Sequence, residues 1–368
     1  MNRKIFVIFI ALLFLLSFFP KIIFAISDTS SVPKEERFEA QILRVDRETI
    51  IDAEGKEETK LSYKVKAVNG YFKGRELTIN SQNVGQVKKS EFRVGDKIIV
   101  ASYQSPGAKE VFFIEDYIRR DSIMWLFLAF VILVFIVGRK TGLGSLAGMA
   151  VSFLIIFYFI LPRIIQGQNP VLITVIASTF IIPATYYLSH GFNLKTNIAI
   201  VGSVITLVFS GILAYFSLDL ARLSGLASEE AGFIQALNPD MINMRGLLLA
   251  GILIGIIGVI DDITISQASI VFQLKKASPK LSFYELYTRA MVVGKDHIAS
   301  MVNTLILVYT GASLPLLLLF IDNPTPFTQV INHEIIAEEI IRTLVASIGL
   351  VFAVPITTLL AAFYAKLK

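Results

Sequence analysis

Seven apolar stretches, each about 20 residues long, follow one another through the second part of the sequence. A helix of about 20 residues crosses the hydrocarbon core of a bilayer, and a series of them is typical of a polytopic membrane protein. Of the 368 residues, 54% are hydrophobic and only 17% are charged. We therefore predict a helical membrane domain over residues 122–368, with spans at Ser122–Gly138, Gly144–Leu161, Pro170–Ser189, Asn197–Leu218, Gly246–Ser266, Ile298–Ile321 and Ile341–Leu360.

Residues 1–26 predict a signal peptide or a signal anchor. Arg3 and Lys4 precede an apolar run from Ile5 to Phe19, and Ala25 is a small residue at a possible cleavage site. The run is long for a signal peptide, so cleavage and retention as an anchor both stay open. In either case the segment predicts that the region after it is exported.

Residues 27–121 have the pattern of a small β domain. Apolar and polar residues alternate from Leu61 to Ala67, and similar runs occur at 36–46, 76–80, 97–103 and 111–116. Five short strands predict a small β-barrel, of OB-like type. Seventeen Lys and Arg balance seventeen Asp and Glu here, which argues against a nucleic-acid surface. We expect a docking or spacer module for an envelope protein partner.

Basic residues predict the orientation of the spans, because Lys and Arg accumulate in cytoplasmic loops. Loops after the first, third, fifth and seventh spans hold ten basic residues, against four on the other side. We therefore expect a bacterial plasma-membrane protein with residues 27–121 outside the cytoplasm and the C-terminus inside. The bilayer is the expected partner, and an oligomer is left open.

The sequence predicts no metal site and no cofactor. Without cysteine, disulfides and thiolate ligands are excluded. The run Asn332–Glu339 resembles the helix of a zinc protease, but Ala337 stands where the second histidine is needed. His190, His297 and His333 are expected in separate loops or on separate sides of the membrane.

Two adjacent carboxylates, Asp261 and Asp262, interrupt the apolar pattern of the fifth span. A charge within a span costs about 2.5 to 3.5 kcal/mol on insertion scales. At 100° per residue, one stripe of this helix contains Gly251, Gly255, Gly258, Asp262 and Ser266. Since glycines permit close helix packing, we predict that this stripe faces the bundle, with Asp262 inside it and Asp261 at its edge. A structural role and a role in ion or substrate handling both remain open.

Two other predicted spans carry polar stripes. In the fourth, the shared face contains Ala199, Ser203, Thr206, Ser210, Ala214 and Ser217; in the sixth, it contains Ser300, Asn303, Thr304, Thr310 and Gly311. Such faces serve helix packing or line a path. The candidate path residues are Asp261, Asp262, Ser266, Asn303 and Thr304.

Three runs of the sequence are similar to those of the YibE/F-like membrane proteins. The runs are Gly258–Ser269, Gly294–Leu305 with Tyr309–Pro315, and Glu338–Leu350 with Val354–Thr358. The resemblance extends from about Glu36 to the C-terminus and implies a bacterial protein with several membrane spans. Ala346 departs from the glycine expected there, which we expect to affect local packing only.

Three functions fit these features. A permease or channel-like protein for a small solute or cation would use the carboxylates and the polar stripes. A non-catalytic membrane scaffold would bind an envelope partner through the β domain. A membrane enzyme ranks last, because no nucleophile or metal set accompanies Lys295, Asp296 and His297.

Overall fold

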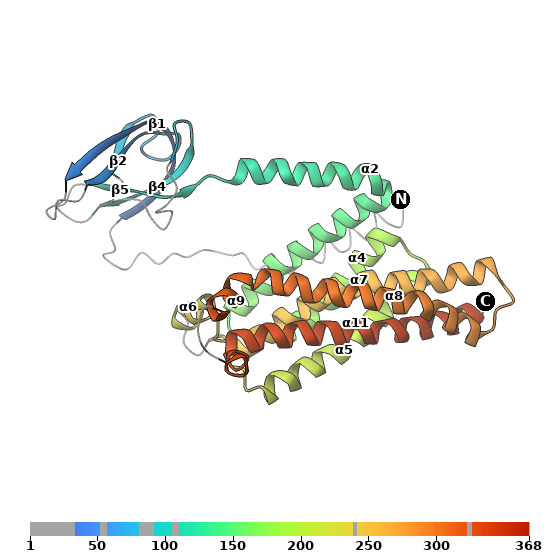
Figure 1. Cartoon of the computed structure of the whole chain (residues 1–368). Coiled ribbons are helices and arrows are strands. Elements are labelled where there is room, and N and C mark those ends of the chain that lie inside the picture. The colour runs from blue at the N-terminus through green and yellow to red at the C-terminus, as the bar shows by residue number, and fades with distance from the viewer. Residues whose placement is uncertain are drawn as a thin grey trace. The chain divides into compact units, whose positions relative to one another are not determined.

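The computed structural model describes residues 34–51, 57–80, 92–104, 110–237, 241–321 and 326–367. Within them the chain forms two compact units, a β unit that continues to Ile132 and a helical unit from Leu133 onward (Figure 1). The predicted signal segment lies outside the described residues.

The β unit is a curled antiparallel sheet of five strands. These are β1 (Lys34–Ile51), β2 (Glu57–Ala67), β3 (Glu76–Asn80), β4 (Lys97–Gln104) and β5 (Val111–Tyr117), in the order β3-β2-β1-β4-β5. The five predicted strands are confirmed. The two edge strands of this order, β3 and β5, are not hydrogen-bonded to each other in the described part of the chain, so closure into an OB-like barrel stays a prediction.

Alternation along the strands builds the core of this unit. Tyr63, Val65 and Ala67 are buried while Lys64 and Lys66 between them are exposed, as a period of two requires. Across the sheet, Phe38 pairs with Val100, which pairs with Ile114, and all three are buried. The β unit therefore has an apolar core of its own.

Six helices in the described residues are long and apolar enough to cross a membrane. The helical segments are α2 (Arg120–Ile155), the π-helical turn η2 (Ile156–Ile160), α3 (Leu161–Ile165), α4 (Pro170–His190), α5 (Leu194–Leu220), α6 (Glu229–Leu237), α7 (Met244–Ala277), α8 (Phe283–Ala312), α9 (Leu314–Ile321), α10 (Phe327–Val330) and α11 (Glu334–Lys366). The first of the six runs from Arg120 through Ile165. It therefore contains the first two predicted spans.

Backbone breaks and prolines explain where the helices differ from the predicted spans. Arg139 has φ 47° and ψ −125°, which interrupts α2 between the first two predicted spans. The turn η2 ends two residues before Pro162, whose missing N–H cannot continue the regular ladder of backbone hydrogen bonds. The predicted sixth span is divided at Ser313, just before Pro315, and its helix α8 begins much earlier, at Phe283.

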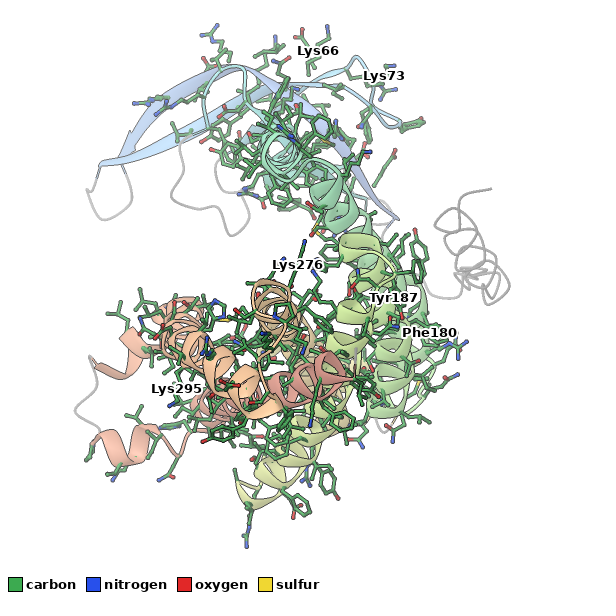
Figure 2. The ribbon with its side chains drawn as sticks, turned by 90° about the vertical axis from the view of Figure 1, so that its right-hand side faces the viewer. Lys66, Lys73, Phe180, Tyr187, Lys276 and Lys295 are labelled. Atoms are coloured by element: carbon green, nitrogen blue, oxygen red, sulfur yellow. The ribbon has the colours of Figure 1, made fainter. Side chains whose placement is uncertain are left out.

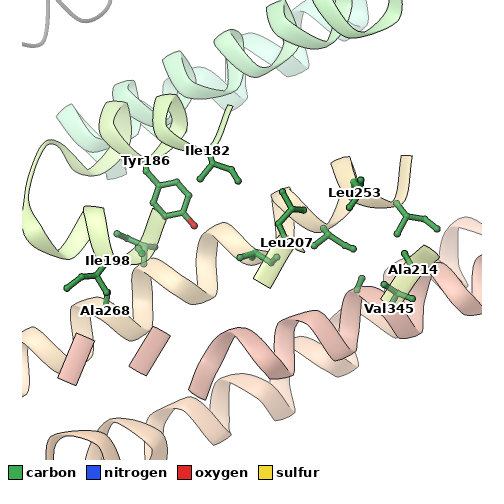
Figure 3. Close-up of a cluster of buried hydrophobic side chains, with 14 of the residues drawn as sticks. Ile182, Tyr186, Ile198, Leu207, Ala214, Leu253, Ala268 and Val345 are labelled. Carbon is green, nitrogen blue, oxygen red and sulfur yellow. The ribbon is translucent and has the colours of Figure 1, made fainter. Parts of the chain in front are cut away.

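Three helices, α5, α7 and α11, pack against one another at the centre of the helical unit, with α4 on α7 and α8 on α11. Their shared core contains Ile182, Tyr186, Ile198, Leu207, Ala214, Leu253, Ala268 and Val345 (Figure 3). Large apolar side chains also cover the outward faces, as with Phe180 on α4, which is 47% exposed (Figure 2). Such faces suit contact with lipid chains.

Candidate functional site

Helix α7 packs through its large aliphatic residues rather than its glycines. The buried face includes Leu249, Ile252, Leu253, Ile256, Ile260, Ile263, Thr264, Gln267, Ala268 and Val271. Gly251 and Gly258 are exposed, and a Cβ placed on either would meet no atom within 4 Å. Gly255 is half-buried, and its nearest such neighbour is the Tyr309 hydroxyl of α8 at 3.5 Å. The prediction that the glycine stripe faces the bundle is therefore wrong within this chain.

Because the aliphatic face of α7 points inward instead of the glycine face, the two carboxylates exchange their predicted positions. Asp262, on the glycine face, is exposed, whereas Asp261 is half-buried and its Oδ1 atom is buried without a hydrogen-bond partner among the described residues. The prediction that Asp262 faces inward is thus corrected in favour of Asp261. Asp262 instead interacts electrostatically with His190 at the end of α4.

Three buried hydroxyl groups from three helices meet beside Asp261. Tyr186 Oη of α4 lies 2.5 Å from Ser203 Oγ of α5 and 2.6 Å from Thr264 Oγ1 of α7, and the last two atoms are 2.9 Å apart. The Tyr186 hydroxyl also interacts with the Asp261 carboxyl. Figure 3 shows the Tyr186 ring within the cluster of buried side chains. These four groups form what we call the hydroxyl–carboxyl cluster.

A second polar contact lies on the same face of α7, one turn further along. Gln267 is fully buried, and its Oε1 atom accepts a hydrogen bond from the Thr358 hydroxyl of α11 at 3.0 Å. Its Nε2 atom has no hydrogen-bond partner in the described segments and lies close to Gly294 of α8, where a Cβ would be only 3.0 Å away. Asp261, Thr264 and Gln267 therefore follow one another at a spacing of three residues, so that each is a neighbour of the next on the helix surface.

The polar stripe predicted on the fourth span is confirmed as a buried face of α5. Its first five residues are buried, and only Ser217 is partly exposed. Helices α5 and α11 are in very close contact at two points. Thr357 Oγ1 of α11 would lie 2.5 Å from a Cβ at Gly202 of α5, and Ser210 Oγ of α5 packs on Gly349 of α11. Within the part of the chain that the structure describes, neither Ser210 Oγ nor Thr357 Oγ1 has a hydrogen-bond partner.

The other candidate path residues do not join this buried cluster. Asn303 and Thr304 lie on the exposed side of α8, as do Ser300, Thr310 and Gly311. The Thr304 hydroxyl donates to the Ser300 carbonyl of its own helix at 3.0 Å. Ser266 is half-buried on α7. Of the five candidates, only Asp261 has an atom buried against the hydroxyl groups.

At the opposite end of the helical unit, the start of α11 contacts the segment between α5 and α6. The Glu334 carboxylate accepts hydrogen bonds from the Ser224 backbone amide and hydroxyl and from the Gly225 amide. Arg342 pairs with Glu339, 3.5 Å away, while Glu338 is buried. No three His, Cys, Asp or Glu side chains of the described residues are grouped as a metal ion would need.

An open pocket of about 510 Å³ lies at the beginning of α4 and α7. Its lining includes Asn169, Gln235, Asn243 and Arg245, so amide groups and one guanidinium face it. Asn169 and Asn243 also cap their helices by accepting bonds from backbone amides. From Asn169 to Tyr186 the helix rises about 25 Å at 1.5 Å per residue, so the pocket and the hydroxyl–carboxyl cluster lie near opposite ends of α4.

Sequence reasoning missed Tyr186, Gln267 and Thr358 because each has other polar residues beside it in its helix and no spacing sets it apart from them. One signal was present in α7, where Asp261, Thr264 and Gln267 recur every three residues. The glycine stripe, 100° away, was the more regular pattern, but packing selected the face with larger side chains.

Comparison with known protein families gives one match to the chain. The model of the YibE/F-like protein family matches residues 126–367, which is well over half of the sequence. The match does not include the β unit, although the sequence resemblance was expected to begin near Glu36. No curated protein and no solved structure matches the chain. The family match, together with the apolar helices, shows that this chain is a multi-pass membrane protein and belongs to the YibE/F-like family.

Proposed function

We propose that this protein is a permease or channel-like protein for a small solute or a cation. The observation that carries the proposal is the Asp261 carboxyl, which lies beside three hydroxyl groups inside the helical bundle and has a buried oxygen with no hydrogen-bond partner among the residues that the structure describes. A buried polar atom without a partner costs about 1 to 3 kcal/mol. Intramembrane carboxyl groups are therefore retained mainly where they bind or conduct something.

The polar stripe of α5 supports a path away from this carboxyl. Ser203 belongs to the hydroxyl–carboxyl cluster, and Thr206 and Ser210 follow it toward the end of α5, where Asp219 pairs with Arg245 at 2.9 Å. Arg245 lines the 510 Å³ pocket. The proposed path thus runs from the pocket along α5 to Asp261. Because Ser210 and Gly202 are in close contact with α11, passage requires α5 and α11 to separate.

Flux through vesicles containing the purified full chain tests this function. We expect wild-type protein to transport at least one solute from a panel of protons, alkali cations, divalent cations and small organic solutes. Asp261→Asn keeps the size of the side chain and should lower that flux about tenfold or more, as expected for a working intramembrane carboxyl. Asp262→Asn is the matched control, because the Asp262 carboxyl is next to Asp261 in the chain but is exposed. This variant should retain most of the flux.

The scaffold function is the second candidate, and one feature of the β unit favours it. Val68 and Tyr71 flank the turn at Gly70 and are 50% and 73% exposed, which offers an apolar contact for an envelope protein. If no solute in the panel crosses vesicles with wild-type protein, this second function replaces the first. In that case Tyr71→Ser should disturb partner binding while Asp261→Asn should not.

A further inference from the structure

The hydrogen atoms of the hydroxyl–carboxyl cluster are too few for its contacts. Tyr186, Ser203 and Thr264 each supply one O–H proton, and their three oxygens are all within 2.9 Å of one another. The Thr264 hydroxyl is also within 3.0 Å of the Ile260 carbonyl, to which it can donate. Three protons thus serve three mutual contacts, a carbonyl and the Asp261 carboxyl. A further proton on the Asp261 carboxyl would supply the missing hydrogen-bond donor.

The spacing of the oxygens favours a proton over a metal ion. Oxygen atoms that surround a cation at about 2.3 to 2.6 Å are held more than about 3 Å apart. The three hydroxyl oxygens are 2.5 to 2.9 Å apart, which is the separation of atoms that share hydrogen bonds. The centre of the cluster therefore has no room for an alkali cation.

Few charges act on this carboxyl. Among the described residues, the groups that interact electrostatically with Asp261 are Asp262 on its own helix and Tyr186 on α4, and neither is a cation. An ionised carboxylate with a buried oxygen and no cationic partner is costly, whereas the neutral acid is far less so. Asp262 and His190 are both exposed and interact with each other.

We infer that Asp261 is the binding site for one proton that exchanges with solution, with Tyr186, Ser203 and Thr264 as its hydrogen-bonding neighbours. Binding forms one O–H bond on the carboxylate and removes one negative charge; release returns the proton to water. No electron is transferred. The inference rests on the proposed function only in naming the proton as the coupling ion of transport, because the site itself is defined by the cluster.

Reaction with dicyclohexylcarbodiimide tests this site, because the reagent modifies apolar-site carboxyl groups in their protonated form. The full-length protein in detergent is treated across a range of pH, and modification of each carboxyl is located by peptide mass spectrometry. We expect Asp261 to be modified, at least about fivefold more at about pH 6 than at about pH 9. Asp262 is the matched control beside it, and its carboxyl group, which is exposed rather than buried, should stay unmodified at both pH values.

A second variant and a salt series sharpen the test. Tyr186→Phe keeps the ring but removes one of the three hydroxyl groups beside the carboxyl, so the pH at which modification falls by half should differ from that of the wild type. Replacing choline chloride with sodium chloride at fixed pH should leave modification unchanged. Protection by sodium would overturn the inference in favour of a sodium site, and absence of Asp261 modification at every pH would overturn it altogether.

The outcome is separable from that of the flux measurement. If Asp261 is modified with the expected pH dependence but no solute crosses the vesicles, the transport function is contradicted and the proton site is supported. If flux depends on Asp261 but Asp261 is not modified at any pH, the transport function is supported and the proton site is contradicted.

Discussion

The Thr358 hydroxyl of α11 lies 3.0 Å from Gln267 Oε1 of α7 and 2.7 Å from the Val354 carbonyl of its own helix, and it can donate its one proton to either acceptor. Both side chains are fully buried. The contact joins two of the three central helices at a point that is closed to solvent. It also lies one turn of α7 beyond Thr264, so it supports the hydroxyl–carboxyl cluster from the side of α11.

Removing this hydroxyl should weaken the bundle. Thr358→Val keeps the shape of the side chain but leaves Gln267 Oε1 buried without a donor, which costs about 1 to 3 kcal/mol. We expect a lower unfolding midpoint for the purified protein in detergent. Thr343→Val is the control on the same helix, because its hydroxyl donates only to the Glu339 carbonyl one turn earlier. Equal effects of the two substitutions would show that the contact between helices contributes nothing.

Gly202 should tolerate no side chain. A Cβ there would be 2.5 Å from Thr357 Oγ1 and 3.3 Å from Thr357 Cβ, and such overpacking costs about 1 to 3 kcal/mol. Gly202→Ala should therefore lower the thermal midpoint, and a second change, Thr357→Ala, should restore part of the loss.

Gly258→Ala is the matched control for this close approach. It adds the same methyl group to another central helix, but at a position where nothing lies within 4 Å. Because alanine favours helices over glycine by about 1 kcal/mol, we expect an unchanged or slightly higher midpoint. A large loss of stability at Gly258 would show that its exposed face is covered in the assembled protein.

The orientation predicted from the basic residues is open to a direct test. A reporter fused after Lys280, in the turn between α7 and α8, should be active only in the cytoplasm. One fused after Asn323 should be active only on the other side. The reverse pattern would place Asp262 and His190 toward the outside and invert the direction from which the proposed proton enters.

The β unit should fold as an isolated fragment from Ser27 to Arg120. It has its own buried core, and the fragment keeps the Arg120–Glu39 ion pair at 2.5 Å. Cooperative unfolding in urea, followed by circular dichroism, would confirm this expectation. A fragment without a cooperative transition would show that the sheet depends on α2 or on another chain.

The stability of that fragment should depend on pH through Asp116. The Arg119 guanidinium, 2.5 Å away, holds the pKa of the Asp116 carboxyl below its usual value, and the Tyr117 backbone amide adds to the effect. A lowered folded pKa stabilises the protein above the unfolded value of about 3.9, and the contribution disappears as the pH falls through the folded value. The difference in unfolding free energy between wild type and Asp116→Asn should therefore be constant near neutral pH and shrink below about pH 4.

A double variant checks the cause of this pH dependence. In an Arg119→Gln background, the Asp116→Asn substitution should change stability less, because the main partner of the carboxylate is absent. An equal effect in both backgrounds would assign the pKa shift to the Tyr117 amide instead.

Much of the architecture follows from the sequence because it depends on local pattern. Alternation with a period of two marked the strands, and the run from Leu61 to Ala67 became β2 with its apolar residues buried. Long apolar runs marked the helices. The stripe of small residues from Ala199 to Ala214 predicted the buried face of α5, since small side chains let helices approach. The family could be recognised from three runs of residues without knowledge of the structure.

Tertiary structure alone decided which face of α7 points inward. The sequence by itself determined that this helix carries two carboxylates and a glycine stripe 100° from Asp261. Hydropathy cannot choose between two apolar faces of one helix, because the choice depends on the volumes that the neighbouring helices offer. Those neighbours accept Ile252, Ile256 and Ile260, so Gly258 and Asp262 turn outward. Asp261 then comes to rest beside Tyr186, a residue 75 positions earlier that only the packing of α4 on α7 brings near.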